Sequence, residues 1–170
     1  YQQMSMAWQK GIQKCWILNV GDIKPAEYQI ELFLDMAWNM NIIYPGDSAD
    51  KDLQPINDWL AQHEMNFWTR EFGKQLAEKM LPVMQESYRL AYIRKPEFLG
   101  NTRCEERDKK YSIISDLPWS EQYINNRLAD YKKLADESER IEKMLNKAIA
   151  KGNLPKERKD EFYQLFKYPV

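Results

Sequence analysis

Residues 118–150, PWSEQYINNRLADYKKLADESERIEKMLNKAIA, decide the fold class of this chain. Apolar or small side chains recur in this stretch at a spacing near 3.5 residues: Ile124, Leu128, Tyr131, Ala135, Ser138, Ile141, Leu145 and Ile149. The spacing predicts one long helix that ends at Gly152. A helix of about 30 residues extends over roughly 45 Å and is unstable alone in water. We therefore expect it to pack along its length against another helix.

Other stretches also have helical periodicity. A short helix is predicted from Met4 to Ile12, and a second begins near Pro25 and ends near Asn39. The second helix is expected to bury one stripe of side chains: Ile30, Phe33, Leu34, Ala37 and Trp38. After a loop at 41–52, a third helix begins around Pro55 and turns apolar side chains toward the core: Leu53, Ile56, Leu60 and Phe67.

Two more helices complete the predicted bundle. One extends from about Thr69 to Tyr92, and Pro82 predicts a kink or break in it because proline removes a backbone hydrogen bond. Residues 94–117 contain Pro96 and Gly100 and have no predicted element. A last helix begins near Pro155 and buries three side chains: Phe162, Leu165 and Phe166. These patterns predict a mainly all-α fold, a bundle of four or five helices.

The run CWILNV at 15–20 is the exception to this helical pattern. It is continuously apolar, rich in β-formers and bounded by Gly21, which is typical of a strand buried on both faces. A single strand cannot satisfy its own backbone donors and acceptors. We therefore expect its neighbours to belong to a longer protein, so that the N-terminal helix and strand are the remnant of another fold.

Composition excludes some classes of partner. The chain has 25 Lys and Arg against 26 Asp and Glu, and the two signs are interleaved. A nucleic-acid partner is not expected, because polyanion binding needs a basic surface. No apolar run approaches the roughly 20 residues that span a bilayer, so no membrane span is expected. Two cysteines, Cys15 and Cys104, form no CxxC pair and leave the compartment open.

Polar side chains follow the predicted strand where it ends. Asn19, Asp22 and Lys24 lie within six residues, and the carboxyl ends of strands are where barrel enzymes place their sites. An Asn amide can bind sugar hydroxyls, an Asp can accept from them or orient water, and a Lys can neutralise a carboxylate. This set suits an acidic sugar. The alternative interpretation is that Asn19 and Asp22 organise the turn and cap the next helix, with Lys24 in solvent.

Other polar and aromatic residues have simpler interpretations. His63 is the only histidine, so we predict no metal site and expect a partly exposed helix residue. Glu27, Glu31 and Asp35 follow at four-residue spacing, which favours a solvated helix side over metal binding. No cofactor is predicted. Six tryptophans could stack on sugar rings, but most fall on helix stripes where core packing explains them. Trp119, at a helix start, is the exception.

The stretch WILNVGDIKPAEYQIELFLDMAW at 16–38 resembles a segment of glycoside hydrolase family 115. Weaker similarity continues through WTREFG at 68–73 and FYQLFKYPV at 162–170. Members of this family have a catalytic (β/α)8 barrel followed by a helical bundle. The resemblance implies that 1–24 is the terminal helix-strand unit of the barrel and that 25–170 is the bundle.

The resemblance also implies a function. The family removes glucuronic or 4-O-methylglucuronic acid, α-1,2-linked to xylose, from glucuronoxylan by inverting hydrolysis. Asn19, Asp22 and Lys24 match its NVGD motif and are expected to bind substrate, with the catalytic residues unknown. The chain alone is expected to be inactive, as a fragment of a secreted or periplasmic enzyme. Its expected partners are the remainder of the barrel and glucuronoxylan or aldouronic acids, and a homodimer is the oligomer to test. The competing interpretation is a non-enzymatic helical interaction or assembly module.

Overall fold

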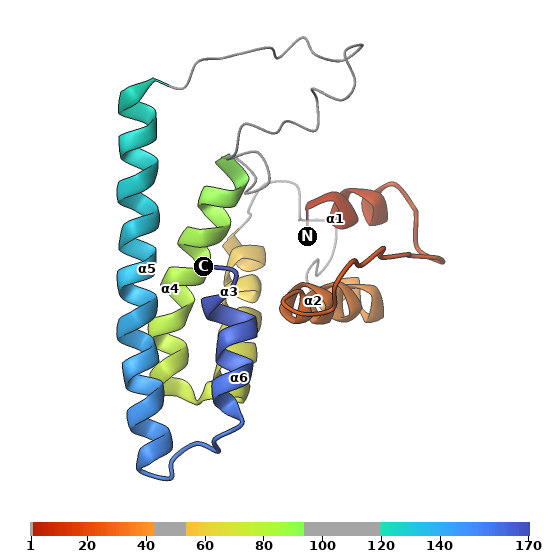
Figure 1. Cartoon of the computed structure of the whole chain (residues 1–170). Helices are drawn as coiled ribbons and strands as arrows, with labels where there is room; N and C mark the ends of the chain where they lie inside the picture. The colour runs from red at the N-terminus through yellow and green to blue at the C-terminus, as the bar shows by residue number, and fades with distance from the viewer. Residues whose placement is uncertain (1, 43–53, 94–119) are drawn as a thin grey trace.

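A computed structural model describes residues 2–42, 54–93 and 120–170 of the chain (Figure 1). Within these ranges every regular element is a helix, which confirms the mainly all-α fold. The elements are α1 (Gln2–Gln9), α2 (Glu27–Trp38), the 3-10 helix η1 (Met40–Ile42), α3 (Gln54–Phe72), α4 (Lys74–Ile93), α5 (Glu121–Ala150), α6 (Arg158–Phe162) and the π-helical segment η5 (Tyr163–Lys167). None of the helices in the described ranges is long and apolar enough to cross a membrane.

The core lies between α3, α4, α5 and the C-terminal segment formed by α6 and η5, which stand side by side (Figure 1). Aromatic rings from α3 and the C-terminal segment meet at its centre. Trp68 meets Phe166 edge to face with ring centroids 6.2 Å apart, and Phe72 meets Phe162 in the same way at 6.0 Å. The predicted burial of Phe162, Leu165 and Phe166 is confirmed. The C-terminal segment therefore closes the bundle.

The junction of α3 and α4 differs from the prediction. A single residue, Gly73, separates the two helices, and its φ of +77° is a left-handed conformation that glycine adopts without strain. The predicted boundary between the two helices was near Thr69, four residues before Gly73. The apolar stripe of the first helix continues into that of the second, so periodicity alone does not mark the junction. Pro82 does not break α4, which extends through it to Ile93. Packing on both neighbouring helices, α3 and α5, compensates the lost backbone bond.

The long helix is confirmed as α5. Ser120 caps it, since its Oγ accepts a hydrogen bond from the Tyr123 backbone N–H at 3.1 Å. It ends at Ala150, and its C-cap residue Lys151 precedes Gly152 at φ +73°. Three of the predicted seam positions in the second half of α5 are buried: Ser138, Ile141 and Leu145. The fourth buried residue is Leu134, which was not predicted, whereas the predicted Ala135 next to it is exposed. Ile124 and Leu128, in the first half, are exposed.

Helix α2 was predicted at the right place but with the wrong side buried. It lies beside the bundle against α3 and buries Tyr28 and Met36. Leu34 and Trp38, expected in the core, are exposed, with Trp38 89% accessible. The reason is that α2 carries apolar residues on two sides, and only one of them meets α3. Periodicity cannot tell which of two apolar sides a neighbour will cover.

The predicted strand at 15–20 is not formed. These residues are neither helical nor paired in a ladder, and Ile17 is 84% exposed. A strand needs a neighbour to bond its backbone groups, and no strand exists in the described residues. Most of the loop at 41–52 and the whole of 94–117 lie outside the described residues.

Candidate functional site

The predicted substrate residues lie on the segment that connects α1 to α2. Asn19 and Asp22 are both exposed on it. Neither is enclosed in the bundle, so both stay accessible to a ligand or to another part of a longer protein. An exposed amide and an exposed carboxylate can together bind sugar hydroxyls. Their role in substrate binding stays a prediction.

Lys24, the third predicted residue, already has carboxylate partners. Its Nζ lies 2.6 Å from Glu161 Oε2 on α6 and 3.1 Å from Glu27 Oε1 on α2. The hydrogen bond to Glu161 raises the pKa of Lys24, partial burial opposes the rise, and Glu27 adds to it. Lys24 therefore anchors the connecting segment to the end of the chain. A ligand carboxylate would have to compete with Glu161 for this ammonium group.

The acidic row on α2 is paired rather than simply solvated. Both oxygens of Glu31 accept from Arg70 on α3, at 3.0 and 2.6 Å, and this pairing raises the pKa of Arg70. Glu71 accepts from Arg70 at 3.1 Å and from Arg158 of α6 at 2.6 Å. The network therefore links α2, α3 and α6 through alternating charges. These charge-assisted contacts add to the apolar packing of Tyr28 and Met36 that holds α2 against the bundle.

His63 joins the same region. Its side chain is 11% exposed, and its Nε2 lies 2.8 Å from Asp35 Oδ2. One donor atom each of Glu31, Asp35 and His63 lies within 4.8 Å of the others, which is a spacing open to a cation. Arg70 argues against that use, because its guanidinium occupies both Glu31 oxygens and places a positive charge beside the site. The arrangement is therefore a bidentate ion pair between Glu31 and Arg70 beside a hydrogen-bond contact between Asp35 and His63.

A buried carboxyl group, Glu64, was not singled out by sequence reasoning. It is 6% exposed and accepts from Trp68 Nε1 and Gln85 Nε2, both at 3.4 Å. Burial raises the pKa of Glu64, and the two hydrogen bonds oppose that rise. Burial also raises the pKa of Tyr28 and of Tyr88, with Glu64 adding to both shifts. Glu64 follows His63 on an amphipathic helix, and no pattern in the sequence indicates that its carboxyl group is buried.

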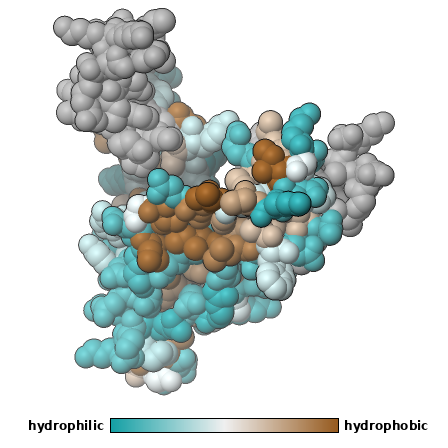
Figure 2. All heavy atoms as spheres, turned by 90° about the vertical axis from the view of Figure 1, so that its right-hand side faces the viewer, coloured by the Kyte–Doolittle hydropathy of each residue, from teal (hydrophilic) through white to brown (hydrophobic). Residues whose placement is uncertain are grey.

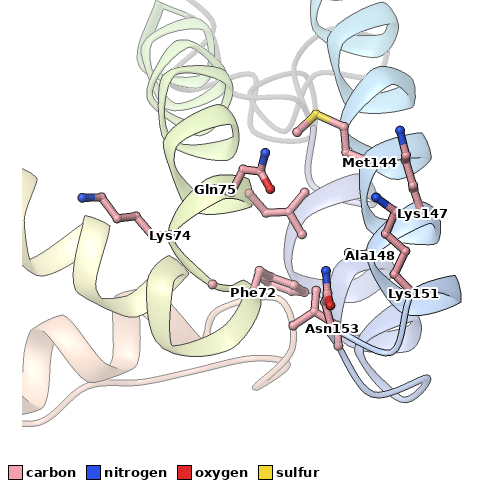
Figure 3. Close-up of a pocket in the computed structure, with 11 residues that line it drawn as sticks. Phe72, Lys74, Gln75, Met144, Lys147, Ala148, Lys151 and Asn153 are labelled. Carbon is pink, nitrogen blue, oxygen red and sulfur yellow. The ribbon is translucent and has the colours of Figure 1, made fainter.

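A hollow of about 410 Å³ opens where α3 turns into α4 and α5 ends (Figure 3). Lys147 and Lys151 extend from α5 on one side, whereas Lys74 points away on the other. The Nζ atom of Lys74 lies 3.9 Å from Oε1 of Glu78 on the same helix. The floor is apolar, with Phe72 buried beneath it. This hollow is basic but offers no exposed aromatic surface.

The tryptophans divide between core and surface. Trp68 is fully buried, as the core interpretation predicts. Trp59 is half-buried, and its ring centroid lies 4.9 Å from that of His63. Trp38 is not in the core, because it lies on the uncovered side of α2. Trp8 and Trp16 are half-buried beside it. Trp119 lies outside the described residues.

Comparisons with known proteins give one consistent result. A family model described as "Glycosyl hydrolase family 115" matches residues 1–98. A solved structure of a family 115 4-O-methyl-α-glucuronidase with specificity for decorated arabinogalactans is 46% identical, with a TM-score of 0.74. The match covers 99% of this chain and 20% of that one, so the chain spans about a fifth of the relative's length. No curated protein matches the chain.

Proposed function

Because this chain belongs to glycosyl hydrolase family 115, we propose that it is part of a longer α-glucuronidase that removes glucuronic or 4-O-methylglucuronic acid side chains from a plant polysaccharide. The observation that carries the proposal is the match at 46% identity over 99% of the chain to a 4-O-methyl-α-glucuronidase. Glucuronoxylan is the predicted polysaccharide. The relative's specificity for decorated arabinogalactans makes that polysaccharide the second substrate to test.

The exposed apolar side chains near the N-terminus support the proposal that the remainder of the enzyme packs there. Figure 2 shows a hydrophobic patch on the face that carries α1 and α2. The exposed apolar side chains of this part of the chain include Ile17, Ile23, Leu34 and Trp38. Leaving a contiguous apolar patch in water is unfavourable, and such patches mark contact surfaces. The unpaired run at 15–20 belongs to the same face and would gain strand neighbours there.

The competing proposal, a self-sufficient helical module, predicts a complete bundle with no unsatisfied segment. Residues 54–93 and 120–170 do form a closed core, but the chain before α2 does not share in it. The exposed Ile17 and the unpaired backbone around it favour the enzyme fragment. The proposal also includes a homodimer and secretion or a periplasmic location. It includes substrate binding by Asn19, Asp22 and Lys24.

Hydrolysis by the longer protein tests this function. Full-length enzyme should release glucuronic or 4-O-methylglucuronic acid from glucuronoxylan or decorated arabinogalactan, measured by anion-exchange chromatography. NMR of the released sugar should show the inverted anomer. The 170-residue chain alone should release none. Release by the chain alone would contradict the fragment proposal, and no release by the longer protein from either polysaccharide would refute the α-glucuronidase proposal.

Variants of the longer protein test the site residues. Asn19→Ala removes one hydrogen-bonding amide and should lower kcat/KM by about tenfold, since one such bond is worth about 1 kcal/mol or more. Asn126→Ala, at an exposed position of α5, is the matched control and should leave kcat/KM unchanged. Lys24→Gln separates two roles. A substrate contact raises KM without lowering thermal stability, whereas a structural anchor to Glu161 lowers stability with KM unchanged.

A further inference from the structure

The carboxyl group of Glu64 lies where three helices meet. Glu64 belongs to α3 and is 6% exposed. Burial and, after it, the charge of Glu64 raise the pKa of Tyr28 on α2 and of Tyr88 on α4, so both hydroxyl groups lie near this carboxyl group. Gln29 of α2 donates to the Tyr88 hydroxyl at 3.2 Å, and Gln85 of α4 donates to Glu64. These five residues, which we call the Glu64 junction, join α2, α3 and α4.

Glu64 has poor partners for a negative charge. In the described ranges it accepts two hydrogen bonds, from the neutral donors Trp68 Nε1 and Gln85 Nε2, and both are 3.4 Å long. Charge-assisted bonds to a carboxylate are shorter, about 2.7–2.9 Å. His63, the neighbouring cation when protonated, has its Nε2 on Asp35 at 2.8 Å instead. Ionised Glu64 is therefore a buried charge without direct pairing to a cation among the described residues, which is far more costly than a buried neutral carboxyl group.

Helix α2 is the element that can move to admit water to this group. α3 and α4 pack on each other along their lengths and share the main core, whereas α2 lies at the side of the bundle (Figure 1). Tyr28 closes the junction from the α2 side, since it is 7% exposed and its ring centroid lies 5.4 Å from that of Phe67. An outward movement of α2 would therefore hydrate Glu64 without parting α3 from α4.

We propose that Glu64 is a proton-dependent latch for α2. Protonated Glu64 keeps α2 docked on α3 and α4, and ionised Glu64 favours an α2 that has moved outward, because the carboxylate is then hydrated. The segment that carries Asn19, Asp22 and Lys24 leads directly into α2. The latch would therefore regulate the placement of these predicted substrate residues, a step that rests on the proposed function.

The direction of the pH effect follows from the groups of the junction. Burial raises the pKa of Glu64, and the hydrogen bonds of its two donors oppose the rise. Docking of α2 is therefore favoured at low pH and is lost as the pH rises through the raised value. Tyr28 and Tyr88 stay uncharged over this range, because burial raises the pKa of each hydroxyl group.

Two further charged groups lie beside the junction. Glu31 of α2 is paired with Arg70 through both of its oxygens, so its charge is compensated. His63 of α3 contacts Asp35 of α2, and a protonated His63 would hold that carboxylate more strongly. Protonation of His63 therefore acts in the same direction as protonation of Glu64, and the experiment has to separate the two.

Hydrogen exchange of the 170-residue chain, measured by mass spectrometry from about pH 4.5 to about pH 7.5 and corrected for intrinsic rates, tests the latch. In the wild type, α2 should exchange faster than α5, and its protection should fall by up to about tenfold per pH unit above the raised pKa of Glu64. Glu64→Gln cannot ionise and should lose most of this dependence. His63→Gln keeps a donor for Asp35 without titrating and should retain the dependence. Glu78→Gln, the same change at an exposed position of α4, is the matched control and should behave as the wild type.

Two results would overturn the latch. One is a pH dependence of α2 protection that is as steep in Glu64→Gln as in the wild type. The other is an equal exchange rate in α2 and α5 at every pH, because Glu64 would then meet water only on global unfolding. Glu64→Met, which has a similar volume and no ionisable group, replaces Glu64→Gln if circular dichroism shows that the latter does not fold.

The exchange measurement needs no hydrolysis, so the latch and the proposed α-glucuronidase activity can fail independently. In the longer enzyme, Glu64→Gln should retain kcat/KM to higher pH than the wild type does. Identical pH profiles of the two active enzymes would overturn the link between the latch and the predicted substrate residues.

Discussion

The C-terminal segment should contribute a large share of the stability through Phe166. This side chain is fully buried, with its ring centroid 5.0 Å from Phe162 and 6.2 Å from Trp68. Phe166→Ala removes the ring and leaves a cavity, which costs about 3–5 kcal/mol. For a domain of this size each kcal/mol lowers Tm by roughly 2–4 °C, so the melting temperature should fall by about 6–20 °C. Urea unfolding, followed by tryptophan fluorescence, measures the change.

A neighbouring residue supplies the control. Tyr163 lies on the same C-terminal segment but is 55% exposed, so Tyr163→Ala should change the free energy of unfolding by no more than about 0.5 kcal/mol. The inference that the C-terminal segment closes the core would be wrong if Phe166→Ala cost less than about 1 kcal/mol with an unchanged m-value.

Three further predictions follow from other contacts. Glu64→Gln should remove a pH dependence of the free energy of unfolding. Because burial raises the pKa of Glu64, the folded state keeps a proton at pH values where the unfolded state has released it. The wild-type free energy of unfolding therefore falls as pH rises from the ordinary pKa of Glu64 through the raised one. Urea unfolding should therefore show that the free energy of unfolding of the wild type increases relative to that of the variant as pH is lowered from about 7.5 to about 4.5. A difference that stays constant over this pH range would contradict the prediction. Gly73→Ala places a Cβ in open space but at φ +77°, so it should cost about 1–2 kcal/mol in thermal unfolding; Gly21→Ala, also in open space and without positive φ, is its control. Arg70→Lys keeps the charge but loses the two-pronged contact with Glu31, so hydrogen exchange in α2 should accelerate while exchange in α5 stays unchanged; equal acceleration in both helices would point to a global effect instead.

The sequence predicted the helices well because each has a strong local signal. The apolar period of α5, the stop at Gly152 and the apolar positions of the last helix all depend on residues within a few turns. The resemblance to family 115, based on 16–38, is confirmed by the family model over residues 1–98.

What failed was decided by neighbours rather than by local pattern. The uncovered side of α2 and the unpaired run at 15–20 depend on which partner is present, and a one-dimensional period contains no such information. The pairing of Lys24 with Glu161 joins residues separated by 137 positions, beyond any sequence motif.

The ion pair between Lys24 and Glu161 also sets an order of events during synthesis. The two residues are 137 positions apart, so Lys24 leaves the ribosome long before Glu161 is made. At roughly 5–20 residues per second, the connecting segment waits about 7–27 s for this partner. A chaperone that binds the newly made connecting segment in that interval acts on it before Glu161 can.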